Sequence, residues 1–103
     1  MRRLLLTAAL MTLIAAPAVQ AETYAGIWQG GAPSTVTFLS RNKLKYCYFD
    51  LCNDLNFSGN KNKQILFRWG TAIYELTRTN TGYRGVFSNT GDPNDTIDLR
   101  LQK

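Results

Sequence analysis

The acidic side chains are the first place to look for chemistry, because this chain of 103 residues contains no histidine. It therefore lacks the usual general base near neutral pH, the commonest metal ligand and the partner of a nucleophilic serine. Catalysis would need a carboxylate pair drawn from Asp50, Asp54, Glu75, Asp92, Asp95 and Asp98. These acids lie mostly at turns or on the exposed phase of strands, and so small a domain offers little wall for a substrate cleft. We expect a protein that is not an enzyme and needs no cofactor.

Segment 92–98, Asp-Pro-Asn-Asp-Thr-Ile-Asp, places oxygen ligands at alternate positions, as calcium loops do. It lacks the glycine at the sixth position and the bidentate glutamate at the twelfth that such loops use. Pro93 and Asn94 are ordinary turn residues. We interpret the segment as a turn and predict no metal site.

Cys47 and Cys52 are the only cysteines, and in an oxidising compartment cysteines spaced this closely predict a disulfide across the end of a hairpin. The tip of that hairpin would present Tyr48, Phe49 and Leu51. Apolar side chains on a stapled loop are pre-organised to act as a binding rim. The alternative is that they fold back and cap one end of the domain.

Basic residues gather in two predicted turns, around Arg41, Lys43 and Lys45 and around Lys61 and Lys63. This pattern suggests one basic end that could contact an anionic surface such as a lipid head group or an acidic glycan. The alternative is a set of ordinary solvated loops. Because no dense basic stripe is interleaved with aromatic residues, we do not expect nucleic-acid binding.

The first 21 residues have the features of a cleavable secretory signal, with a charged start, an apolar stretch and a small-residue cleavage site. The apolar stretch is about a dozen residues long, whereas a membrane-spanning helix needs about 20. We therefore expect a mature chain without a transmembrane segment, exported to the periplasm or the cell exterior. Cleavage would leave residues 22–103, 82 residues that form one domain, and would lower the net charge from +5 to +3.

Beyond residue 22 the chain shows period-two alternation bounded by Gly, Asn, Asp and Pro, which predicts an all-β fold. Seven or eight short antiparallel strands would close into an up-and-down barrel or pack as a compact sandwich, and a barrel leaves no open edge. The predicted strands are 23–29, 35–40, 44–49, 51–57, 64–69, 72–78, 83–88 and 96–102.

The same alternation predicts an interior rich in aromatic side chains. Large rings on most strands of so small a barrel would fill it, so we expect no roomy cavity. The predicted inward residues are Val36, Phe38, Tyr46, Leu55, Phe57, Ile65, Phe67, Trp69, Tyr74, Leu76, Tyr83, Phe87, Ile97, Leu99 and Leu101.

Gly26-Ile27-Trp28 in the first predicted strand and Arg100 in the last resemble the arrangement in the lipocalin, avidin and fatty-acid-binding superfamily of ligand-binding barrels. The resemblance implies that Trp28 closes one end of the barrel and that Arg100 stacks on it, both in structural roles. Segment 67–76 is also similar in style to the central strands of small periplasmic lysozyme inhibitors.

The sequence thus favours a small exported β-barrel that binds a small apolar ligand or a protein partner without catalysis. One alternative is an inhibitor of a secreted or cell-wall enzyme, such as a lysozyme or a protease. Another is an envelope-associated protein held by its basic end.

Overall fold

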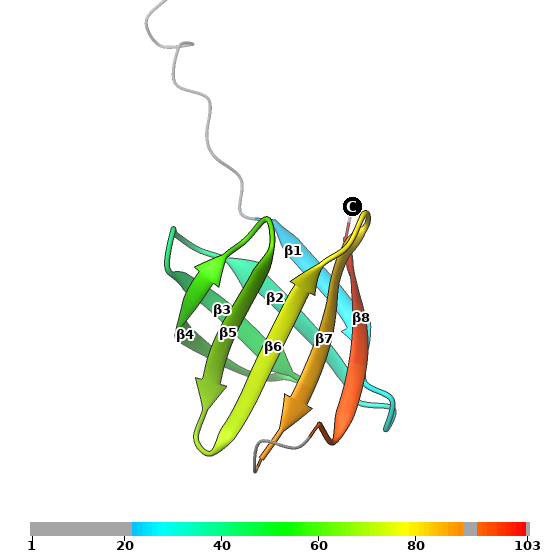
Figure 1. Cartoon of the computed structure of the whole chain (residues 1–103). Coiled ribbons are helices and arrows are strands. Elements are labelled where there is room, and N and C mark those ends of the chain that lie inside the picture. Colours follow the sequence, from blue (N-terminus) through cyan, green and yellow to red (C-terminus); the bar gives the residue numbers. More distant parts are fainter. Residues whose placement is uncertain (1–21, 90–92, 103) are drawn as a thin grey trace, which may run out of the picture.

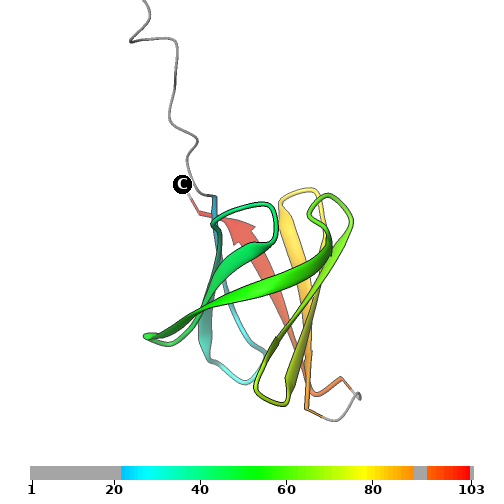
Figure 2. The same cartoon turned by 90° about the vertical axis from the view of Figure 1, so that its left-hand side faces the viewer.

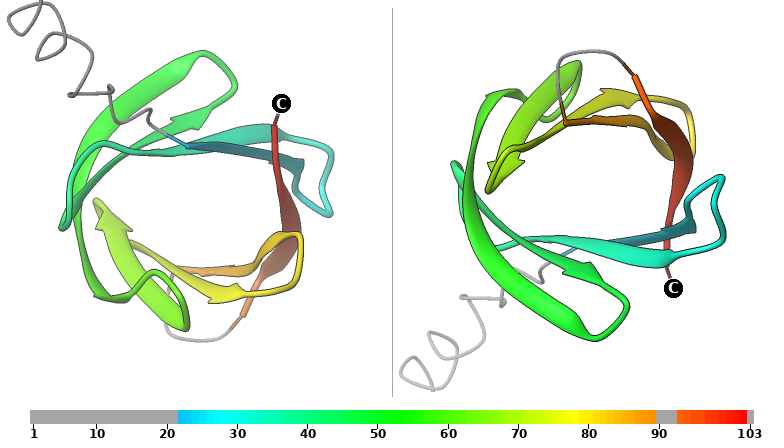
Figure 3. Two further views of the ribbon diagram at one scale, coloured as in Figure 1. Left: turned by 90° about the horizontal axis from the view of Figure 1, so that it is seen from above. Right: turned by 90° about the horizontal axis from the view of Figure 1, so that it is seen from below.

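The chain runs up and down through eight antiparallel strands that close into a barrel in sequence order (Figure 1). Viewed along the barrel axis, the strands form a ring (Figure 3). The computed structural model describes residues 22–89 and 93–102, so the predicted signal segment 1–21 lies outside the described residues. The strands are β1 (Thr23–Ile27), β2 (Pro33–Phe38), β3 (Lys43–Tyr48), β4 (Leu51–Asn60), β5 (Gln64–Trp69), β6 (Ala72–Arg78), β7 (Gly82–Ser88) and β8 (Asp95–Leu101). The prediction of a small antiparallel barrel is confirmed.

Two glycines let the barrel close at β8. A Cβ atom on Gly26 of β1 would collide with the carbonyl oxygen of Asp98, and one on Gly82 of β7 would collide with that of Leu99. Any larger residue at either position would push β8 away from its neighbour. The glycine of the Gly-Ile-Trp motif therefore has a steric role where the first strand meets the last.

The inward phase of the strands forms one continuous hydrophobic core. Most of the predicted interior residues are buried, whereas Leu55, Trp69 and Phe87 are half-buried and Leu101 is 42% exposed. Leu101 stands at the end of β8, beyond the packed interior. The alternation did not identify four further buried hydrophobic residues, Tyr24, Trp28, Ala32 and Leu44.

One aromatic cluster fills the barrel at the end that holds Glu22 and the end of β8. It consists of Tyr24, Phe38, Phe57 and Tyr83, which meet mainly edge to face at centroid distances of 5.0 to 6.0 Å. The guanidinium of Arg78 lies over both tyrosine rings, and its Nη1 donates a hydrogen bond of 3.0 Å to the Tyr24 hydroxyl. This end is therefore occupied by the protein's own side chains.

Strand β4 changes partner halfway along its length. Residues Leu51 to Asn56 pair with β3, and only Phe57 to Asn60 pair with β5. The β3–β4 hairpin consequently projects away from the rest of the barrel (Figure 2). Asn53 is exposed although it stands on the inward phase, because the β3–β4 hairpin separates from the other strands of the barrel at this position.

Candidate functional site

The turns that join β1 to β2, β3 to β4 and β5 to β6 lie at one end of the barrel, together with the end of β7 and the start of β8, and we call this end the mouth (Figure 1). A pocket of about 400 Å³ opens there, and we call it the mouth pocket. Its walls include five aromatic side chains, Trp28, Tyr48, Trp69, Tyr74 and Phe87. At the opposite end the rings of Tyr24, Phe38, Phe57 and Tyr83 fill the interior, but the expectation of no roomy cavity does not hold at the mouth.

Strand register explains how the rings reach one wall. Phe67, Tyr74, Phe87 and Asp95 occupy directly opposed positions on β5, β6, β7 and β8, so all four stand on the inward phase. The Phe67 and Tyr74 rings stack at 4.9 Å, and the Tyr74 and Phe87 rings lie 5.3 Å apart. The row thus forms a continuous aromatic surface that ends in a carboxylate.

Small residues create the space above this surface. Gly30, Ala32 and Ala72 line the mouth pocket, and Ala72 lies directly opposite Trp69 in the β5–β6 ladder. A larger side chain at Ala72 would occupy the volume that Trp69 faces. The pocket therefore depends on side-chain size at these mouth positions as well as on the width of the barrel.

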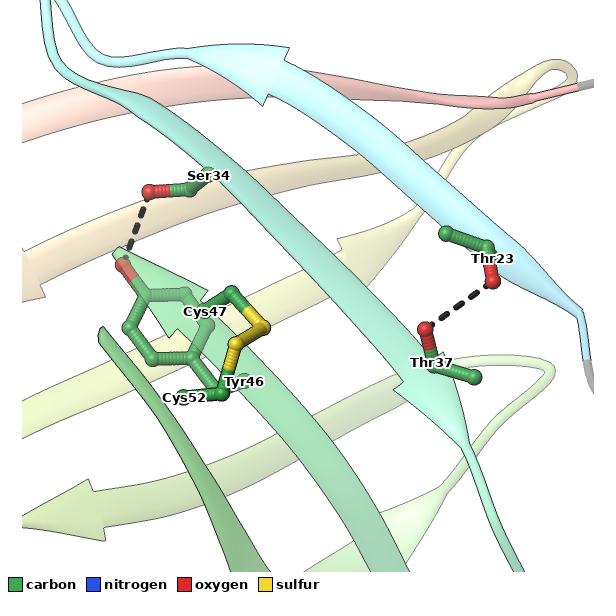
Figure 4. Close-up of a disulfide and its surroundings, with 6 residues drawn as sticks. All are labelled: Thr23, Ser34, Thr37, Tyr46, Cys47 and Cys52. Atoms are coloured by element: carbon green, nitrogen blue, oxygen red, sulfur yellow. Dashed lines mark hydrogen bonds between the residues drawn. A yellow bond between two sulfur atoms is a disulfide. The ribbon is translucent and has the colours of Figure 1, made fainter. Parts of the chain in front are cut away.

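A buried polar triad fixes the ring of Trp28. Its indole Nε1 donates hydrogen bonds to the Ser34 hydroxyl at 2.8 Å and to the Tyr46 hydroxyl at 3.1 Å. The Ser34 and Tyr46 hydroxyls lie 3.0 Å apart and share a further hydrogen bond (Figure 4). The buried polar atoms thereby satisfy one another, and Trp28 offers the pocket a ring whose N–H is already bonded.

Burial changes the acidity of two tyrosines beside the pocket. Desolvation raises the pKa of Tyr46, against the opposing effect of its hydrogen bonds with Ser34 and Trp28. Burial also raises the pKa of Tyr74, and the nearby Tyr46 hydroxyl raises it further. Both phenols are neutral at physiological pH, so neither supplies a general base.

Asp95 is held at the edge of the pocket by backbone donors. Its Oδ2 accepts a hydrogen bond of 3.2 Å from the Gly30 amide, and its Oδ1 accepts one of 2.8 Å from the Thr96 amide. The Gln29 amide also donates to the Thr96 carbonyl at 2.9 Å. These contacts connect the β1–β2 turn to the start of β8 and fix the carboxylate in place.

The other acids are dispersed over the barrel. Asp98 points outward and pairs with Arg84 at 3.1 Å, while Asp54 lies opposite Lys45 in the β3–β4 ladder. In the 92–98 segment, Asp92 lies outside the described residues, and Asp95 and Asp98 stand on opposite phases of β8. Within residues 22–89 and 93–102 no group of three metal-ligating side chains comes together.

The disulfide between Cys47 and Cys52 is present, with Cα atoms 4.0 Å apart across the β3–β4 hairpin (Figure 4). The predicted rim divides at the tip: Tyr48 and Leu51 line the mouth pocket, whereas Phe49 does not. Instead, Phe49 lies against β1 and β2 and helps to line a second, more open pocket with Ile27, which we call the outer pocket.

Phe49 has a left-handed backbone conformation, with φ of 57°. It occupies the first central position of a two-residue hairpin turn, where glycine is the usual residue. Its amide donates to the Pro33 carbonyl at 2.9 Å. The turn therefore keeps a bulky residue in a strained conformation on the outside of the mouth.

The structure does not bring Arg100 and Trp28 together. Trp28 is buried and packs on Tyr74 and Phe87, whereas Arg100 is exposed on the outward phase of β8. The expected stacking of Arg100 on Trp28 is therefore absent, because strand alternation directs the two side chains to opposite sides of the wall. The cations that cover rings in the core are Arg78, over Tyr24 and Tyr83, and Lys61, over Phe38, and both lie at the opposite end of the barrel.

The two basic turns lie at the same end of the barrel, opposite the mouth. Arg41 and Lys43 stand at the β2–β3 connection, and Lys61 and Lys63 at the β4–β5 connection. All four are exposed. No helix in the described part of the chain is long and apolar enough to span a membrane.

The comparisons with known proteins found no matching family model, no matching curated protein and no matching solved structure. The resemblances to ligand-binding barrels and to lysozyme inhibitors therefore remain predictions. The site itself defines a small antiparallel barrel with one aromatic pocket at its mouth.

Proposed function

We propose that this protein is a non-catalytic binding protein that holds a small, ring-bearing ligand in the mouth pocket. The observation that carries this proposal is the pocket of about 400 Å³ with five aromatic side chains in its walls. Ligand pockets in proteins span roughly 300 to 1,000 Å³ and are mostly apolar with a few fixed polar groups. A ligand of one to three aromatic rings matches that size.

We further propose that the protein acts outside the cytoplasm. The predicted signal segment supports export, and a disulfide is compatible with an oxidising compartment. A binding role also agrees with the resemblance of the Gly-Ile-Trp motif to ligand-binding barrels. The ligand would then be a molecule of the envelope or the surrounding medium.

A fluorescence titration with N-phenyl-1-naphthylamine, a neutral probe that brightens in apolar surroundings, tests the proposal. We expect saturable binding of one probe per chain, and loss of that binding in Ala72→Phe, whose new ring fills the space opposite Trp69. Thr71→Phe is the matched control, because Thr71 is exposed and does not line the pocket. It should bind the probe as the wild type does.

Circular dichroism must show that both variants keep the β fold. Absence of saturable binding to the wild type would refute the proposal. So would equal binding by wild type and Ala72→Phe, because the probe would then occupy another site.

A protein partner, such as a secreted enzyme that this chain inhibits, is the second candidate function. It is favoured by the apolar surface at the outer pocket, where Ile27 is 65% exposed and Phe49 is 57% exposed. Exposed apolar side chains on a stapled hairpin are suited to protein recognition. Under this alternative, Phe49→Asp abolishes partner binding or enzyme inhibition and leaves probe binding in the mouth pocket unchanged.

A further inference from the structure

We propose that the mouth pocket selects cationic ligands, in particular an aryl or alkyl ammonium. This inference rests on the proposed function, because it names the chemical class that the pocket accepts. Among the described residues that line the pocket, Asp95 is the one that carries charge. The other lining groups are aromatic, aliphatic or glycine.

The Asp95 carboxylate has capacity for a ligand. A carboxylate offers about four lone-pair sites. Each oxygen of Asp95 accepts one backbone hydrogen bond, from Gly30 or from Thr96, and both bonds hold the group in position. The remaining lone pairs face a bound cation as hydrogen-bond acceptors for an N–H ammonium, and the carboxylate charge attracts a quaternary ammonium in the same place. Because Asp95 is half-buried, its charge is less screened than that of a fully exposed acid.

The aromatic walls also favour a positively charged ligand. A cation is attracted to the negative face of a Trp, Tyr or Phe ring within about 6 Å, and tryptophan is the strongest of the three. Trp28, Trp69, Tyr74 and Phe87 all line the pocket to which Asp95 contributes its carboxylate. An ammonium on an aryl ligand can therefore meet both a carboxylate and ring faces, whereas an anionic group would be repelled by Asp95.

The distribution of charge over the barrel supports this selection. The turns at the mouth carry Asp50, and β8 begins there with Asp95, whereas four of the exposed cations stand at the other end, in 41–43 and 61–63. Strand β5 carries one cation near the mouth, Arg68, and its side chain is exposed on the outward phase, away from the pocket. Strands of six or seven residues separate the two ends by up to about 20 Å, which exceeds the ~10 Å screening length at 0.1 M salt.

A pair of isosteric probes tests the inference. Phenyltrimethylammonium and tert-butylbenzene have the same shape and differ in one charge. We expect the wild-type protein to bind the ammonium about 10-fold more tightly, as cation–π contact and a fixed carboxylate together would provide. In Asp95→Asn that preference should fall to about twofold or less. Asp50→Asn is the control, because Asp50 lies at the mouth but does not line the pocket, and it should keep the preference.

The outcomes separate this inference from the proposed function. Equal affinity for the two probes in the wild type would overturn the cation preference and leave the pocket as a binding site. A preference that persists in Asp95→Asn and disappears in Asp50→Asn would also overturn it, because the charge would then act from the surface. Binding of neither probe would contradict the proposed function itself.

Discussion

Removal of the disulfide should weaken the fold by a small and calculable amount. The bond closes a loop from residue 47 to residue 52, a sequence separation of 5. For so short a loop the chain-entropy model gives about 2 kcal/mol of stabilisation at 25 °C. Little else should be lost in Cys47→Ser/Cys52→Ser, because Cys52 is exposed and Cys47 is half-buried, outside the core.

The neighbouring pairs keep the hairpin in register without the bond. Tyr46 pairs with Asn53 and Tyr48 pairs with Leu51, on either side of the two cysteines. A loss of 1 kcal/mol lowers the Tm of a domain of 60 to 100 residues by roughly 4 to 8 °C. We therefore expect the doubly substituted variant to remain folded at 25 °C and to melt roughly 8 to 16 °C below the wild type.

Urea unfolding followed by tryptophan fluorescence measures this directly, because Trp28 and Trp69 report on the mouth of the barrel. The oxidised wild type and the doubly substituted variant are compared at the same protein concentration. An unfolded variant at 25 °C would show that the bond supports the whole barrel, contrary to the reasoning from its position. A difference below about 0.5 kcal/mol would show that the flanking pairs already close the hairpin in the unfolded chain.

Two further predictions concern stability. Phe49→Gly should change the free energy of unfolding by less than about 1 kcal/mol, because relief of the left-handed backbone strain offsets the lost packing. Phe67→Ala removes a buried core ring and should lower the free energy of unfolding by about 3 to 5 kcal/mol in the same urea assay. Since the pKa values of Tyr46 and Tyr74 are raised in the folded state, the unfolded chain loses these protons first, and stability should decline as the pH rises above 10. A phenolate absorbance titration should show these two groups ionising together with unfolding; their ionisation in a still-folded protein near pH 10 would contradict the assigned burial.

The period-two pattern was sufficient to predict the barrel. Strands β5 and β6 have the predicted bounds, because Gly70 and Thr71 between them form an unambiguous tight turn. Strand β4 extends three residues beyond its predicted end, through Gly59, whose φ of 98° only glycine readily adopts. A glycine in a strand was interpreted as a turn signal, and the partner change along β4 could not be predicted from periodicity.

The binding site was predicted less well than the fold. The cysteine spacing predicted one rim of Tyr48, Phe49 and Leu51, but the left-handed conformation of Phe49 directs its side chain to the other side of the wall. Asp95 was grouped with the turn acids, although its position two residues before the inward Ile97 puts it on the inward phase. That spacing was the available signal for the carboxylate of the mouth pocket.

The role of the small mouth residues had no sequence signal. Ala32 and Ala72 are unremarkable in composition, and their effect arises only because the closed barrel sets them beside Trp28 and Trp69. Arg100 differs from them, because the predicted inward positions of Leu99 and Leu101 already place it on the outward phase of its strand. Long-range register, about which one sequence carries little information, decides the placement of the small mouth residues.

The most direct test of the mouth pocket is a ¹H–¹⁵N correlation spectrum recorded during titration with phenyltrimethylammonium. The chain contains two tryptophans, and both line the pocket, so their indole N–H signals are two site-specific reporters. We predict that both signals shift along one saturable curve, together with the amides of Ala72 and Asp95. Unchanged indole signals, or shifts confined to Ile27 and Phe49 at the outer pocket, would contradict the account.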